Sequence, residues 1–179
     1  MCAGYAQVTS VLYPVMELYT NDTYPALLSY EWRIPTMTDV TLLNGLLGGL
    51  LATIVMTALM MTLGDDSPPP TALFWSQYVG DAGPKEYMMQ GMALHFLYGI
   101  GAGVVLAAVV PEVGFETVEL LEAVGIGLGY GFVLFVGAAV VWMNIVLDLD
   151  PEPSDVGQFL LFHLIYGVVL GAVIGVGLV

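Results

Sequence analysis

Four long apolar segments, separated by short polar or proline-containing stretches, dominate the pattern of this chain. No Asp, Glu, Lys or Arg occurs between residues 40 and 64, 87 and 111, 123 and 147, or 156 and 179. At about 1.5 Å per residue, each segment is long enough to cross a hydrocarbon core of about 30 Å as a helix. The pattern predicts an all-α bundle of four transmembrane helices, a multi-pass protein of the cell membrane whose partner is the lipid bilayer.

The ends of the predicted helices follow from capping and helix-breaking residues. The first helix is expected from about 41 to 63, with Asp39 or Thr41 as its N-cap, and Ser154 can cap the last helix. Residues 73–79 fit a short amphipathic helix on the membrane surface. Because the connection between the second and third helices is short, these two are expected to be antiparallel neighbours.

A repeated set of polar and small residues relates the second apolar segment to the fourth. The set Gln90, His95, Tyr98, Gly99 and Gly103 recurs with identical spacing at Gln158, His163, Tyr166, Gly167 and Gly171. An even number of helices separates the two sets, so the two halves have the same orientation in the membrane. The sequence therefore predicts two parallel helical-hairpin repeats, one at about 41–110 and one at about 116–179.

Residues 1–36 differ from the rest of the chain. They are rich in tyrosine, interrupted by prolines and without a sustained period, which predicts an interfacial or disordered leader. The four-helix transmembrane domain is expected at 37–179. Met37 directly precedes the first apolar segment, so it is an alternative start of the native chain.

Within each repeat, the histidine, the tyrosine three residues later and the glycines four and eight residues later share one helix face. At 100° per residue they fall within an arc of about 140°. Small residues at this spacing allow two helix backbones to approach closely in a membrane. The expected intramembrane polar face consists of His95, Tyr98, His163 and Tyr166. The expected helix-packing glycines are Gly45, Gly49, Gly99, Gly103, Gly127, Gly131, Gly167 and Gly171.

His95 and His163 are the only histidines of the chain, and each lies about 12 to 14 Å along its helix from the last preceding charge. A polar group at that depth is costly unless it is paired. One interpretation is that each neutral imidazole hydrogen-bonds a carbonyl or hydroxyl group and joins the helices. A second is that the two His/Tyr pairs line a path for protons or a small solute.

Two cofactor interpretations remain. His95 and His163 are alternative axial ligands for a b-type haem in an electron-transfer protein. Met88, Met92 and His95 share one helix face, and thioethers with imidazole suit Cu(I). The second repeat has Val156 and Leu160 in place of the two methionines, so methionine as apolar packing is preferred. The main expectation is therefore no metal and no cofactor.

Composition agrees with a membrane protein and excludes several function classes. A hydrophobic fraction of 58% and a mean hydropathy of +0.87 are too apolar for a soluble domain of 179 residues. Two basic residues against 16 acidic ones exclude nucleic acid as a partner. An acidic, nearly lysine-free exterior indicates an extreme halophile, an archaeon. A single cysteine, Cys2, excludes an internal disulfide.

Two motifs carry a resemblance to a known group of proteins. They are Asn44-Gly45-Leu46-Leu47-Gly48-Gly49 running into Ala52-Thr53 and Met56-Thr57, and His95-x-x-Tyr98-Gly99-x-x-x-Gly103. The stretch 37–179 resembles an uncharacterised family of small four-helix integral membrane proteins from haloarchaea. This resemblance implies the fold and the source, and it transfers no catalytic residue.

No P-loop, nucleophile elbow or zinc-protease motif occurs in the chain, so no enzyme is predicted. The expected function is that of a non-catalytic integral membrane protein of a halophile. It would act as a scaffold or accessory subunit, or as a simple permeation unit for protons or a small solute. Other membrane subunits or a second copy are its expected protein partners. The alternative is the bis-His b-haem electron-transfer protein.

Overall fold

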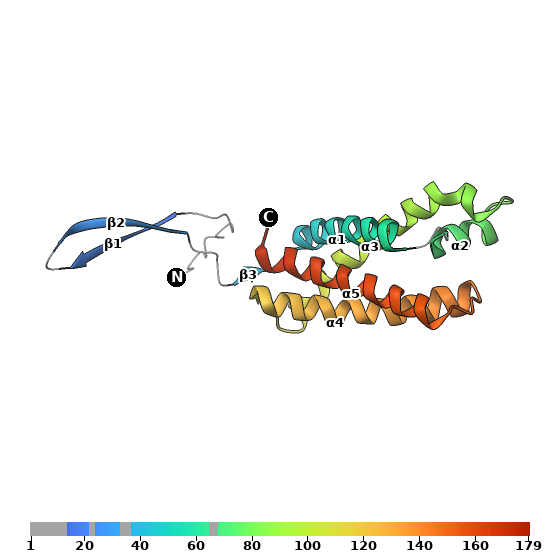
Figure 1. The fold of residues 1–179 in the computed structure, drawn as a ribbon. Helices are drawn as coiled ribbons and strands as arrows, with labels where there is room; N and C mark the ends of the chain where they lie inside the picture. The colour runs from blue at the N-terminus through green and yellow to red at the C-terminus, as the bar shows by residue number, and fades with distance from the viewer. Residues whose placement is uncertain (1–13, 22–23, 33–36, 65–67) are drawn as a thin grey trace.

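The computed structural model describes residues 14–21, 24–32, 37–64 and 68–179. Its helices are α1 (Leu42–Leu63), α2 (Pro70–Tyr78), η1 (Pro84–Tyr87), α3 (Met88–Glu112), α4 (Leu120–Ala138), η2 (Ala139–Val146) and α5 (Pro153–Val176) (Figure 1). Four segments are long and apolar enough to cross a membrane: Leu42–Leu63, Pro84–Glu112, Leu120–Val146 and Pro153–Val176. The predicted all-α fold with four membrane helices is confirmed, and its lengths and composition are those of a multi-pass membrane protein.

Local capping chemistry sets the helix ends. The Thr41 hydroxyl accepts a hydrogen bond of 3.0 Å from the Asn44 N–H, and Gly64 follows the last residue of α1. The prediction that Ser154 caps α5 is wrong. Glu152 is the N-cap, in a reciprocal capping box with Asp155. Pro153 occupies the first helical position, where its fixed φ and missing N–H fit, so the helix starts before Ser154.

The four long helices form two layers, one with α1 and α3 and one with α4 and α5 (Figure 1). Helix α1 packs against both α3 and α5, and α5 packs against α4. The expectation that the second and third spans pack as neighbours is wrong, because α3 and α4 have little direct contact. The glycine faces of these two helices are turned toward α1 and α5. A hydrogen bond of 2.9 Å from the Tyr130 hydroxyl to the Ala102 carbonyl connects them.

Close backbone approach at glycines holds each layer together. A Cβ atom built on Gly49 would lie 2.8 Å from the Gly99 carbonyl oxygen, and one on Gly127 would lie 2.9 Å from the Gly171 Cα. Both distances are too short for a real side chain. The eight glycines expected at helix contacts lie at these two crossings: Gly45, Gly49, Gly99 and Gly103 between α1 and α3, and Gly127, Gly131, Gly167 and Gly171 between α4 and α5.

One end of the bundle is closed by short backbone contacts. Strand β3 (Thr38–Asp39) pairs antiparallel with β4 (Thr117–Val118). The Thr38 hydroxyl donates a hydrogen bond of 3.0 Å to the Gly175 carbonyl. These contacts join the start of α1, the connection between α3 and α4, and the end of α5.

Two further strands lie within the stretch expected to be a leader. Strand β1 (Pro14–Asn21) pairs antiparallel with β2 (Tyr24–Trp32), and the hairpin stands beyond the β3 end of the bundle (Figure 1). The other parts of the predicted leader, 1–13, 22–23 and 33–36, lie outside the described residues. The expectation of an interfacial or disordered leader stays a prediction.

Candidate intramembrane binding site

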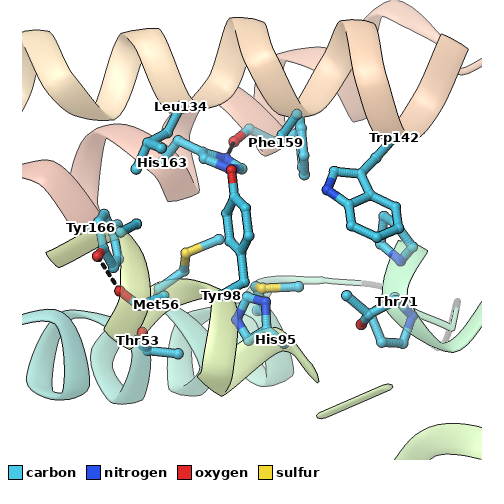
Figure 2. Close-up of a pocket in the computed structure, with 16 residues that line it drawn as sticks. Thr53, Met56, Thr71, His95, Tyr98, Leu134, Trp142, Phe159, His163 and Tyr166 are labelled. Atoms are coloured by element: carbon cyan, nitrogen blue, oxygen red, sulfur yellow. Dashed lines mark hydrogen bonds between the residues drawn. The ribbon is translucent and has the colours of Figure 1, made fainter. Parts of the chain in front are cut away.

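The four residues of the expected polar face line one cavity. His95 and Tyr98 of α3 and His163 and Tyr166 of α5 surround a space of about 60 Å³ between the two helix layers. The two histidines approach this space from opposite layers, and Tyr98 reaches from α3 toward His163 (Figure 2). A volume of this size holds a few water molecules. The four polar side chains expected to share a face therefore line a common cavity between the helices.

The two residues that α5 contributes to the polar face, His163 and Tyr166, are buried and hydrogen-bonded. The Nδ1 atom of His163 lies 2.8 Å from the Phe159 carbonyl oxygen, one helical turn earlier. Because a carbonyl oxygen only accepts, Nδ1 is the donor, and Nε2 of a neutral ring is then an acceptor. The Tyr166 hydroxyl donates to the Gly99 carbonyl of α3 and so joins the two layers. The first interpretation from the sequence was that the histidines join the helices. In the structure Tyr166 makes such a contact, whereas His163 bonds within its own helix.

Their counterparts on α3 have different surroundings. The Nε2 atom of His95 is buried and has no hydrogen-bond partner among the described residues. Tyr98 is 40% exposed, whereas Tyr166 is buried. A buried polar atom without a partner costs about 1–3 kcal/mol. The buried Nε2 atom of His95 is therefore available to a water molecule, a solute or a metal ion.

The remaining cavity wall is mostly apolar and comes from every helix of the bundle. Helix α1 contributes Thr53, Met56 and Met60, and α4 contributes Leu134 and Ala138. The Thr53 hydroxyl donates 2.6 Å to the Gly49 carbonyl of its own helix, so it offers the cavity no free proton. An apolar wall keeps the polar groups in a medium of low dielectric constant, where their interactions with a guest are strong.

A π-helix supplies two wall residues that sequence reasoning did not place in the site. The segment η2 continues α4 with wider turns, seen in the hydrogen bond of 3.0 Å from Leu147 N to the Trp142 carbonyl. Trp142 of this segment lines the cavity, and the adjacent Met143 lines a neighbouring groove. The residues of η2 are mostly apolar, as they would be in an α-helix that spans a membrane, so the sequence does not indicate the π-helical turns.

A wider groove of about 570 Å³ meets the cavity. His95, Met60 and Phe159 line both spaces, so they form the junction. The groove lies where α1 ends and α5 begins, and Asp150 and Asp155 line it. Five methionines also line it: Met60, Met61, Met88, Met92 and Met143. Methionines from α1, α3 and η2 therefore share one groove.

The cavity does not fit a bis-His haem. Tyr98 extends from α3 toward His163, across the space that a porphyrin between His95 and His163 would occupy. The two helix layers would have to separate, which would break the hydrogen bond between Tyr166 and Gly99.

Replacement of Tyr166 by Phe is expected to lower the free energy of unfolding by about 1 kcal/mol, because it removes a buried hydrogen bond between the layers. The matched control is Tyr98→Phe, since the Tyr98 hydroxyl has no protein partner among the described residues. Unfolding by denaturing detergent, followed by circular dichroism, measures both. Equal losses in the two variants would show that the Tyr166 hydroxyl does not join the layers.

Comparison with known proteins adds no family to this description. No protein-family model, no curated protein and no solved structure matches the chain.

Proposed function

We propose that this chain is a non-catalytic integral membrane protein of the cell membrane, an accessory subunit that holds a small polar guest in its His/Tyr cavity. The observation that carries the proposal is the convergence of His95, Tyr98, His163 and Tyr166 on one cavity. Polar side chains inside a bilayer are costly, and those that face a cavity commonly contact a substrate, an ion or a partner group. The buried, unpartnered Nε2 atom of His95 is the group that a guest would satisfy.

Access from one end favours binding over conduction. The groove reaches the cavity at His95, on the side where α1 ends. Toward the β3 end, the fully buried Ala52 and Leu170 and the nearly buried Leu106 pack together in the core. The glycine crossings bring the backbones into contact on the same side. A guest that enters from the groove would therefore meet a closed floor.

Permeation of protons or a small solute is the second candidate. It is favoured by the position of His95, which lines both the groove and the cavity, because an imidazole relays protons near neutral pH. A complete path would also require the packed core at the β3 end to open. In proteoliposomes with a pH gradient, we expect no proton flux above that of empty liposomes. Flux that disappears in both His95→Ala and His163→Ala would instead establish permeation.

Native mass spectrometry of protein released from its own membranes tests the binding proposal. We expect a non-covalent adduct that is lost in the double variant His95→Ala/His163→Ala and kept in Leu97→Ala, a change at an exposed position of the same helix α3. A wild-type protein without an adduct, or an adduct that survives in the double variant, would contradict the proposal. The same preparation is expected to lack a Soret band, and such a band would establish the haem alternative.

We also propose that the bundle arose by duplication of one hairpin in a halophilic archaeon. Gly49 meets Gly99 in the first crossing much as Gly127 meets Gly167 in the second. Strands β3 and β4 pair antiparallel just before α1 and α4, with Asp39 opposite Thr117, as expected near a twofold axis. The excess of 16 acidic over two basic residues supports the halophilic source.

A further inference from the structure

Half of the methionines of this chain gather in the groove beside the His/Tyr cavity. The chain has 10 methionines, and those of the groove come from three different parts of the bundle. Met60 and Met61 end α1, Met88 and Met92 begin α3, and Met143 belongs to η2. Residues this far apart in the sequence meet only because α1, α3 and η2 converge here. Methionine is soft and polarizable, and its thioether sulfur is only a weak hydrogen-bond acceptor.

An imidazole nitrogen lies at the inner end of the same groove. His95 lines the groove together with the methionines, and its buried Nε2 atom has no hydrogen-bond partner among the described residues. Thioether sulfur and imidazole nitrogen form a soft donor set. Hard cations such as Mg²⁺ and Ca²⁺ prefer carboxylate, carbonyl and water oxygens. The donors that converge here are therefore suited to a soft ion.

We propose that the methionine groove binds one Cu(I) ion between the thioethers of Met60, Met88 and Met92 and the Nε2 atom of His95. The inference goes beyond the proposed function, because the ion would lie in the groove and would share only His95 with the His/Tyr cavity. Asp150 and Asp155 line the groove as well, and their carboxylates raise the local concentration of cations. No cysteine is among the described residues that line the groove, so the ligands of the ion would be three thioethers and one imidazole.

The unequal repeats predict how many ions bind. Val156 and Leu160 stand in the second repeat where the first has Met88 and Met92. His163 differs from His95 as well, because its Nδ1 atom is hydrogen-bonded to Phe159 and it does not line the groove. The bundle should therefore hold one ion per chain, although it has two histidines at equivalent positions.

The experiment uses the full chain with Cys2→Ser, which removes the competing thiol, purified in detergent without an affinity tag. Ag(I), which resists oxidation, and Cu(I) under anaerobic reducing conditions are the probes, and equilibrium dialysis with elemental analysis counts the bound ions. We expect about one ion per chain, with affinity reduced by about tenfold or more in Met88→Leu/Met92→Leu. The control Met89→Leu, at a position that is 81% exposed and outside the groove, should bind like the parent.

Histidine variants separate this inference from the proposed function. Ag(I) binding should weaken in His95→Ala and persist in His163→Ala, whereas a guest of the inner cavity depends on both residues. X-ray absorption of the Cu(I)-loaded protein should show sulfur neighbours. No saturable binding, equal binding in Met88→Leu/Met92→Leu and Met89→Leu, or a spectrum with only nitrogen and oxygen neighbours would overturn the Cu(I) site. An adduct that is lost in both histidine variants would still support the cavity as a binding site for a different guest.

Discussion

Replacement of Gly127 by Ala is expected to destabilise the bundle, whereas the same change at Gly129 on the same helix should be neutral or stabilising. A Cβ atom on Gly127 would lie 2.9 Å from the Gly171 Cα, inside the crossing of α4 and α5. A Cβ atom on Gly129 would meet no other atom within 4 Å. In an open helix position Ala is favoured over Gly by about 1 kcal/mol, while overpacking a tight contact costs about 1–3 kcal/mol. The two substitutions should therefore differ in sign.

Equilibrium unfolding in mixed micelles with a denaturing detergent, followed by tryptophan fluorescence, measures this difference. Both variants carry the same chemical change on the same helix, so any effect on the micelle or on helix propensity is shared. Losses of equal size at Gly127 and Gly129 would mean that α4 and α5 do not cross at Gly127.

Replacement of Leu170 by Ala is expected to cost about 2–5 kcal/mol of unfolding free energy, because it leaves a cavity where the two layers meet. Leu170 of α5 is completely buried, and its side chain lies beside Gly48 of α1. The matched control is Leu161→Ala, on the same helix at a position that is 47% exposed, where a change of less than about 0.5 kcal/mol is expected.

This comparison also tests the contact between α1 and α5, which closes the floor of the cavity. The loss of packing at Leu170 should appear both in detergent and in lipid bicelles. If Leu170→Ala and Leu161→Ala have the same small effect, the layers do not pack at Leu170 and the one-ended cavity lacks its floor.

The membrane spans and the ends of α1 could be predicted because both depend on neighbouring residues. A long stretch without charge and a Thr41 cap beside it are properties of the local sequence. The shared cavity of His95 and His163 could also be predicted, because a repeat with parallel orientation places equivalent residues at equal depth.

The choice of helix neighbours could not be predicted from the short connection between α3 and α4. That connection limits the distance between the helix ends, but the glycine faces decide which helix surfaces meet. Tyr98 and Tyr166 differ in burial for the same reason, because equivalent positions on α3 and α5 face different neighbouring helices. Similarly, the π-helical winding that carries Trp142 and Met143 has no pattern of its own in an apolar segment.

The methionine groove shows the limit of reasoning along single helices. On a single helix, Met88 and Met92 share one face with His95, and their absence from the equivalent positions 156 and 160 favours apolar packing. Contributions from α1 and η2 become visible only when the helices are assembled. The absence of these methionines from the second repeat then predicts a single metal site.

Thiol cross-linking shows whether His95 and His163 face one cavity inside the bundle. In a Cys2→Ser background, the pair His95→Cys/His163→Cys is treated with a short bifunctional thiol reagent, and intramolecular links are counted by mass spectrometry. We expect an efficient link, and a weak one for the control pair Leu97→Cys/His163→Cys, whose first position is exposed on the outer face of α3. Equal linking in both pairs, or none at positions 95 and 163 when both thiols react with a monofunctional reagent, would contradict the shared cavity.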